Sequence, residues 1–199
     1  MRRIRTVLCL SVVTLCFLVF GTRPLAAQEG RGVSLGIHVL GGARYDNVRM
    51  CVGSPAGVPG GPIGEVYFDV RIPAGPDGHV VINIPLFRPI FFAAAFGMLQ
   101  LEPLVMYEYS PSTTGAVQPV FAGGLGAVLH YGPDYTSGPE SPGPSFFAAG
   151  PQIAGFAGIR FWEERMTAGA KIFYAPLFSA AHPPGTVAGG GLEVHYAFR

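Results

Sequence analysis

The stretch Glu65-Val-Tyr-Phe-Asp-Val-Arg-Ile72 alternates polar or charged residues with apolar ones over its whole length. Successive side chains of a β-strand point to opposite faces, so the alternation separates two rows. The apolar row is Val66, Phe68, Val70 and Ile72, and the polar row is Glu65, Tyr67, Asp69 and Arg71. The pattern predicts a strand with one apolar face and one charged face.

The same alternation recurs in further segments along the chain, which brings the expected number of strands to about eight. The apolar rows lie within residues 33–39, 80–84, 99–109, 121–131, 153–161, 166–174 and 192–198. The opposite rows carry Ser34, His38, Arg44, His79, Asn83, Gln100, Glu102, Glu108, Gln118, His130, Gln152, Arg160, Arg165, Thr167, Lys171, Glu193 and His195. The chain is therefore expected to be all-β, without helices.

Composition decides which row faces inward. Only 13% of the residues are charged, and 49% are hydrophobic, whereas an average soluble domain has about 25% charged residues. Lipid cannot hydrate a charge, and an Arg or Lys at the bilayer midplane of a barrel's outer face costs about 2–4 kcal/mol. We therefore predict a single transmembrane antiparallel up-and-down β-barrel with an apolar outside and a polar interior.

The in-strand charges form a candidate network in this interior. It comprises Arg44, Glu65, Asp69, Arg71, Glu102, Glu108, Arg160, Lys171 and Glu193. Eight strands leave an interior just wide enough for side chains to fill, and a charge there is costly unless it is paired. A compensated salt-bridge network is favoured over a conduction path, which remains the alternative.

The connections between the expected strands also fit a membrane barrel, in which long outer loops alternate with tight turns. The segments Asp46–Gly64 and Tyr131–Ser145 are long, Ser179–Gly185 is intermediate, and Pro73–Gly78, Ser110–Gly115 and Trp162–Glu164 are short. The segment Arg88–Phe96 is apolar on both faces and is left open between an outer hairpin tip, an interfacial segment and a partner contact. Interfacial girdles are expected from Tyr45, Tyr107, Tyr109, Tyr131, Phe161, Trp162, Tyr174, Tyr196 and Phe198.

The amino terminus has the three regions of a secretory signal peptide. Three arginines lie within Met1–Thr6, an apolar run follows over Val7–Phe20, and small residues precede Gln28. Cleavage is expected after Ala27, with Ala26 as the alternative, so that residues 1–27 direct export through the Sec route and residues 28–199 form the barrel. An uncleaved anchor is the other interpretation.

Removal of this segment changes the charge and the cysteine inventory. Cys9 and Cys16 lie within it, so Cys51 stays alone, and no intrachain disulfide is expected. Nine basic residues then face twelve acidic ones. This balance argues against a nucleic-acid partner, which would require a basic patch.

The last strand, Gly191-Leu-Glu-Val-His-Tyr-Ala-Phe198, resembles the C-terminal signal of bacterial outer-membrane barrels, in which hydrophobic residues alternate and an aromatic residue ends the chain. Its signal residues are Leu192, Val194, Tyr196 and Phe198, and Arg199 after them is a departure. The segments Leu101–Tyr109, Gln118–Gly126 and Gly155–Phe161 look like strands of the OmpA-like and OmpX-like outer-membrane β-barrel domain family.

The resemblance implies an eight-stranded barrel in the outer membrane of a Gram-negative-type cell, in contact with membrane lipids and the barrel-assembly machinery. It implies no single activity, because this family includes adhesins, structural proteins, small pores and a few enzymes.

Catalytic and metal chemistry find little support in the sequence. One lipid-A deacylase type carries a His-x-Ser pair, and none of the five histidines here is followed by x-Ser. His38, His79, His130 and His195 share the interior row, but they lie on different strands and in no ligand-spaced pair, so they are interpreted as polar filling. No enzyme activity, cofactor or metal is expected.

The favoured function is a non-catalytic outer-membrane barrel with a structural role, or a surface-binding role through its outer loops. A porin-like narrow channel for small or apolar solutes is the alternative. A lipid-modifying barrel enzyme and a soluble periplasmic lipid-binding β protein are further ones, and the last of these would bury the apolar rows and expose the charges.

Overall fold

The structure is a computed structural model that describes residues 32–48, 58–111, 115–138 and 140–198. The described strands and helix all belong to the unit Val33–Arg199. The expected signal peptide and Cys51 lie outside the described residues. Within them, no helix is long and apolar enough to cross a membrane.

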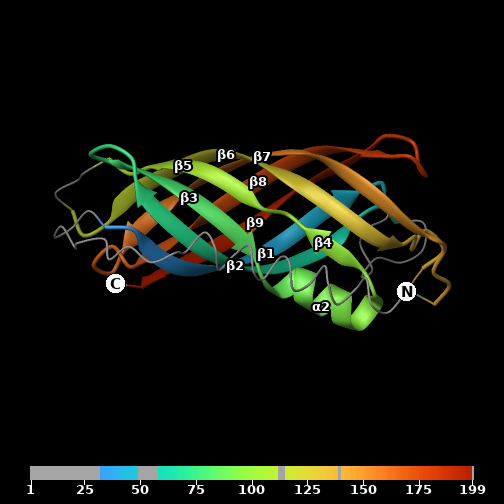
Figure 1. The fold of residues 1–199 in the computed structure, drawn as a ribbon. Helices are drawn as coiled ribbons and strands as arrows, with labels where there is room; N and C mark the ends of the chain where they lie inside the picture. Colours follow the sequence, from blue (N-terminus) through green and yellow to red (C-terminus); the bar gives the residue numbers. More distant parts are fainter. Residues whose placement is uncertain (1–31, 49–57, 112–114, 139, 199) are drawn as a thin grey trace, which may run out of the picture. The chain divides into compact units, whose positions relative to one another are not determined.

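The strands of this unit close into an antiparallel up-and-down barrel (Figure 1). The strands are β1 (Ser34–Asp46), β2 (Gly61–Pro73), β3 (Gly78–Pro85), β4 (Leu99–Leu101), β5 (Leu104–Tyr109), β6 (Gln118–Pro133), β7 (Ser145–Phe161), β8 (Met166–Ser179) and β9 (Gly185–Phe198). Strand β4 pairs with β6, and the other strands pair in the order β1-β2-β3-β5-β6-β7-β8-β9, with β9 pairing with β1 to close the ring.

Strands β4 and β5 are one strand of the barrel with a break. Both pair with β6, and the pairs Leu101↔Leu129 and Leu104↔Gly126 keep one register across the break. The break falls at Glu102-Pro103, where proline has no N–H to give to the ladder. The barrel therefore has eight strands, which confirms the expected fold class.

The two faces of the wall differ sharply in burial. Leu192 in β9 is 73% exposed, whereas Glu193 beside it is 2% exposed. The same holds around the barrel, where the exposed outward positions include Leu35, Val39, Val105, Phe121, Leu125, Ile153, Ile159, Ile172 and Val194. The apolar rows are on the outside and the charged rows are inside, as the sequence analysis expected.

One helix, α2 (Phe87–Phe96), follows β3 and corrects the expectation of a helix-free chain. The segment is apolar on nearly every side, so it lacks the 3.6-residue alternation by which a surface helix is recognised. Pro89 lies in the first turn, where a missing N–H is tolerated. Gly97 ends the helix with φ 62°, a left-handed conformation that suits glycine.

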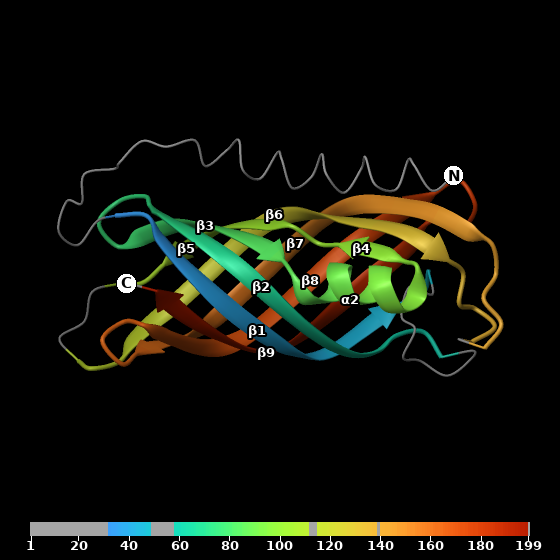
Figure 2. The same cartoon turned by 60° about the horizontal axis from the view of Figure 1, so that its bottom comes forward.

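The helix fills a gap in the barrel wall. The β2–β3 ladder covers only Tyr67–Pro73 of β2, and α2 contacts both the remaining part of β2 and the short strand β4. Figure 2 shows α2 lying along the wall beside β4. Phe87, Ile90 and Phe91 of the helix are exposed on the outside, whereas Arg88 is buried.

The boundaries of several connections differ from the expected ones. Residues Gly61–Gly64 belong to β2 rather than to the first loop, and β6 runs to Pro133 rather than ending at Tyr131. Arg165 precedes β8 instead of facing the interior, and its Nε lies 3.9 Å from Glu163 Oε2. Turn residues and strand ends share polar side chains, so alternation alone does not separate them.

Candidate functional site

The candidate site is the barrel interior. All nine residues of the predicted charge network are buried there, none more than 6% exposed. Three of these residues lie on β2 and mark three levels along the barrel. Arg71 lies near the short β2–β3 turn, Asp69 is central, and Glu65 lies toward the opposite end. The structure gathers the charges into three clusters at these levels.

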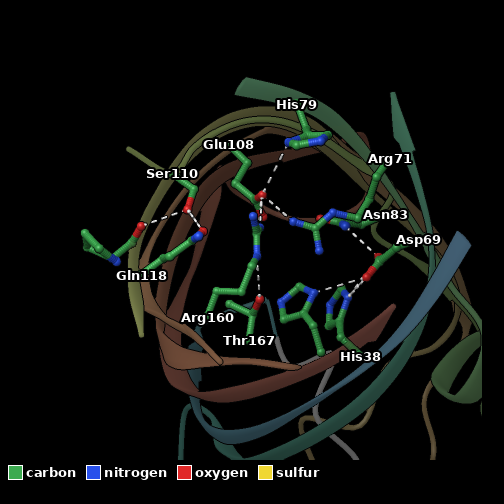
Figure 3. A network of polar contacts seen from close by, with 12 residues as sticks. His38, Asp69, Arg71, His79, Asn83, Glu108, Ser110, Gln118, Arg160 and Thr167 are labelled. Atoms are coloured by element: carbon green, nitrogen blue, oxygen red, sulfur yellow. Dashed lines mark hydrogen bonds and ion pairs between the residues drawn. The ribbon is translucent and has the colours of Figure 1, made fainter. Parts of the chain in front are cut away.

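The first cluster, which we call the Glu108 clasp, consists of Arg71, Glu108 and Arg160. Glu108 Oε1 accepts a hydrogen bond from a terminal nitrogen of each arginine. The three residues come from β2, β5 and β7, none of which are neighbours in the barrel, so the clasp crosses the interior (Figure 3). His79 Nδ1 lies 3.9 Å from the same carboxylate oxygen.

The second cluster, the His38 cluster, consists of His38, Asp69, Lys171, Glu193 and His195, which come from β1, β2, β8 and β9. Asp69 accepts hydrogen bonds from His38 Nδ1 at 2.8 Å and from His195 Nδ1 at 3.1 Å. Both rings thus converge on one carboxylate. Figure 3 shows Asp69 facing His38.

Neighbouring side chains hold the two histidine rings and Asp69 in place. Asn83 Nδ2 donates to Asp69 Oδ1 at 2.7 Å. The His38 ring stacks on Tyr67 with centroids 4.3 Å apart and on the His195 ring at 4.2 Å. These contacts restrain both imidazoles.

Glu193 is the second acid of the His38 cluster and has its own cation. Its Oε1 lies 2.5 Å from His195 Nε2, and its Oε2 lies 3.1 Å from Lys171 Nζ. Lys171 Nζ also lies 4.8 Å from the centre of the Tyr67 ring, a cation–π contact. Lys171 therefore neutralises Glu193 locally.

The third cluster, the Arg88 cluster, ties α2 to the interior through Arg44, Glu65, Arg88 and Glu102. Arg88 Nη1 donates to Glu102 Oε1 at 2.9 Å, and the same oxygen accepts from Arg44 Nη1. The backbone N–H of Arg88 donates to Glu65 Oε1 at 3.0 Å. Arg44 Nε also lies 3.4 Å from Asp46 Oδ2.

The sequence analysis missed Arg88 and Asp46 as members of the interior network. Arg88 lies in a segment without alternation, so no strand parity assigned it to a face. Its one signal was that it is the single charge in the apolar stretch Phe87–Phe96, because such a charge needs a buried partner.

Beyond the Arg88 cluster the interior is packed with apolar side chains. The buried core there consists of Val48, Val128, Phe146, Ala148, Phe173, Ala175, Leu177 and Val187. His130 lies in this region, with its ring 4.8 Å from that of Phe146. Side chains thus fill the interior at this level as well as at the three ionic ones.

His38 and His195 have no ligand-like spacing in the sequence, yet strand pairing brings them together. The β1–β9 register places them directly opposite each other. The ligand atoms of His38, Asp69 and His195 all lie within 4.8 Å of one another. Sequence spacing could not reveal this pair, because it depends on the pairing of the first strand with the last.

Comparison with solved structures supports the barrel fold. No protein-family model matches the chain, and no curated protein matches it significantly. The crystal structure of Neisserial surface protein A (NspA) is similar, with a TM-score of 0.52 and 10% identity over 85% of this chain and 100% of that one.

The crystal structure of the N-terminal β-barrel domain of Pseudomonas aeruginosa OprF matches with a TM-score of 0.44 and 14% identity, over 85% of this chain and 100% of that one. The likeness to NspA, at 10% identity, concerns the shared barrel fold.

Proposed function

We propose that the protein is an integral barrel of the bacterial outer membrane, non-catalytic and closed to ions, with a structural role or a surface-binding role through its outer loops. The observation that carries this proposal is the polarity of the wall: large apolar side chains are exposed outside, and ionic side chains are buried inside.

The outward face suits lipid and not water. A soluble lipid-binding barrel would bury its apolar rows around a ligand and expose its charges. Here Leu125, Ile172 and Leu192 are each more than two-thirds exposed, and the neighbouring interior charges are buried. Helix α2 fits the same environment, because a helix satisfies its backbone hydrogen bonds internally.

The interior supports a closed barrel rather than a channel. A conducting pore needs a continuous hydrated path, whereas the Glu108 clasp joins strands across the interior and the Arg88 cluster does the same near α2. Each guanidinium of these clusters has a carboxylate partner. Charge pairing of this kind avoids the cost of an unpaired charge in the filled interior.

The arrangement of the interior histidines supports a non-catalytic role. A hydroxyl or thiol nucleophile needs a base within hydrogen-bond reach. The hydrogen bonds of His38 and His195 go instead to carboxylates. The outer loops, such as the one between β6 and β7, are then the surface for a binding partner. The structurally similar NspA is called a surface protein.

Membrane fractionation with a heat-modifiability gel tests the outer-membrane location of the protein and the formation of a closed barrel. We expect the protein in the outer-membrane fraction, with an unheated band that runs faster than the heated one. A soluble band without a heat shift would contradict the proposal and favour a periplasmic protein with an enclosed apolar site.

Ion flow is tested separately, by planar-bilayer recording of the purified barrel. We expect no steady conductance from the wild-type protein because the ionic clusters cross the interior. Reproducible single-channel steps would favour the channel alternative over the closed barrel.

A further inference from the structure

We propose that His38, Asp69 and His195 form a binding site for one divalent transition-metal ion, Zn²⁺ being the representative, which joins β1, β2 and β9 inside the barrel. The site goes beyond the proposed function, which assigns no metal ion to the barrel.

The donor atoms of the three residues lie close together. Both imidazole Nδ1 atoms lie 2.8–3.1 Å from the Asp69 carboxylate, close to the spacing between ligands of a four-coordinate zinc ion. Two imidazole nitrogens and one carboxylate form a donor set that suits Zn²⁺, and the fourth position is left for water.

Asp69 differs from the interior glutamates in its charged partners. Glu65, Glu102, Glu108 and Glu193 each have an Arg or Lys within salt-bridge distance. Asp69, by contrast, is 1% exposed, and its only salt-bridge partners among the described residues are the two histidines. A buried carboxylate needs a cation, and here the cation is either a proton on a histidine or a metal ion.

Neighbouring polar side chains surround the proposed ligands. Metal-binding histidines commonly donate their second ring N–H to a carboxylate, which fixes the ring orientation. Glu193 Oε1 lies 2.5 Å from His195 Nε2 and 3.7 Å from His38 Nε2, and the latter has no hydrogen-bond partner. Asn83 orients Asp69 in the same way. With the Nδ1 atoms on the metal, both Nε2–H groups point toward Glu193.

The site would have a structural consequence at the seam of the barrel. Strand β1 is the first strand and β9 the last, and their pairing closes the ring. An ion bound by side chains of β1, β2 and β9 joins both sides of this closure. Because the ion binds the folded state, it would stabilise the closed barrel by mass action.

The test is zinc titration of the full-length, tag-free protein folded in detergent and stripped with a chelator. We expect one Zn²⁺ per barrel and a higher urea midpoint with zinc. The variants Asp69→Asn and His195→Gln should lose affinity by at least about 100-fold, and Glu193→Gln by roughly 10–100-fold, as for outer-shell partners. The matched controls are His130→Gln, beside Phe146, and His182→Gln, between β8 and β9, and both should bind zinc normally.

X-ray absorption of the zinc-loaded wild-type protein identifies the zinc ligands directly and does not depend on the folding of any variant. Two imidazole ligands and oxygen ligands are expected. Less than one zinc per barrel, a bound zinc with fewer than two imidazoles, or undiminished binding in a folded Asp69→Asn variant would overturn the proposal.

Discussion

The Glu108 clasp and the His38 cluster lie at neighbouring levels of the same interior, yet they are built differently. The clasp joins three strands that do not touch one another, and two arginines share one carboxylate. The core of the His38 cluster joins three adjacent strands, and two histidines share one carboxylate. The first arrangement holds opposite walls together, and the second holds one section of wall.

The cations also differ in chemistry. An arginine cannot lose its proton in a protein, so both cations of the clasp keep their charge. A histidine can become neutral or exchange its proton for a metal ion. We infer that the clasp keeps the interior closed to ions, whereas the His38 cluster can change its charge state.

Glu108→Gln should have the largest effect. It leaves Arg71 and Arg160 buried without a carboxylate, and breaking a buried pair in this way costs about 3–5 kcal/mol. Urea unfolding in detergent micelles measures the loss. Glu163→Gln is the matched control, because the Glu163 side chain is 77% exposed and should change stability little.

Removing all three charges of the clasp separates the cost of an unpaired charge from the cost of lost packing. The combined variant Arg71→Met, Glu108→Leu, Arg160→Met should recover most of the lost stability, because no unpaired charge remains. If it is as unstable as Glu108→Gln, the penalty comes from lost packing, and the orphaned-charge explanation fails.

Asp69→Asn in metal-free protein should destabilise the barrel less, by about 1–3 kcal/mol, the usual cost of an unsatisfied buried hydrogen-bonding group. The two histidines can become neutral, so no permanent charge is orphaned. The same urea titration applies. A loss equal to that of Glu108→Gln would show that the two clusters are energetically alike.

Arg88→Gln should loosen α2 and leave the clasp intact. The side chain of Arg88 connects the helix to Glu65 and Glu102. We expect amide hydrogen exchange within Phe91–Phe96 to accelerate about tenfold, which corresponds to about 1.4 kcal/mol. Amides of the β6–β7 ladder are the internal reference, and equal acceleration there would indicate global destabilisation.

Glu163→Gly should have the smallest effect, in the opposite direction. Trp162, Glu163 and Glu164 all have positive φ, 53° at Glu163, which is unfavourable for residues with a Cβ. Relief of this strain, about 1–2 kcal/mol, is partly offset by the greater freedom of glycine in the unfolded chain, about 0.5–1 kcal/mol, which leaves a net stabilisation of no more than about 1 kcal/mol. A decrease in the urea midpoint would show that the Glu163 side chain has a role of its own.

The sequence is sufficient to predict which residues lie on each face of the barrel wall. It is not sufficient to predict which interior side chains contact one another. Alternation assigns Asp69 and Glu108 to the interior because a strand places every second residue on the same face. It cannot show that Glu108 meets Arg160 or that His38 meets His195, because these contacts depend on strand register and ring closure. Helix α2 was missed because its apolar residues have no period.

The central claim is that the apolar rows face lipid and the ionic rows are enclosed. Nitroxide scanning of residues 192–198 tests it most directly, with single cysteines in a Cys51→Ser background and the protein in lipid vesicles. Leu192, Val194 and Phe198 should be accessible to lipid-dissolved oxygen, whereas His195 and Ala197, which are buried, should be protected. Reversed or absent alternation would contradict the account.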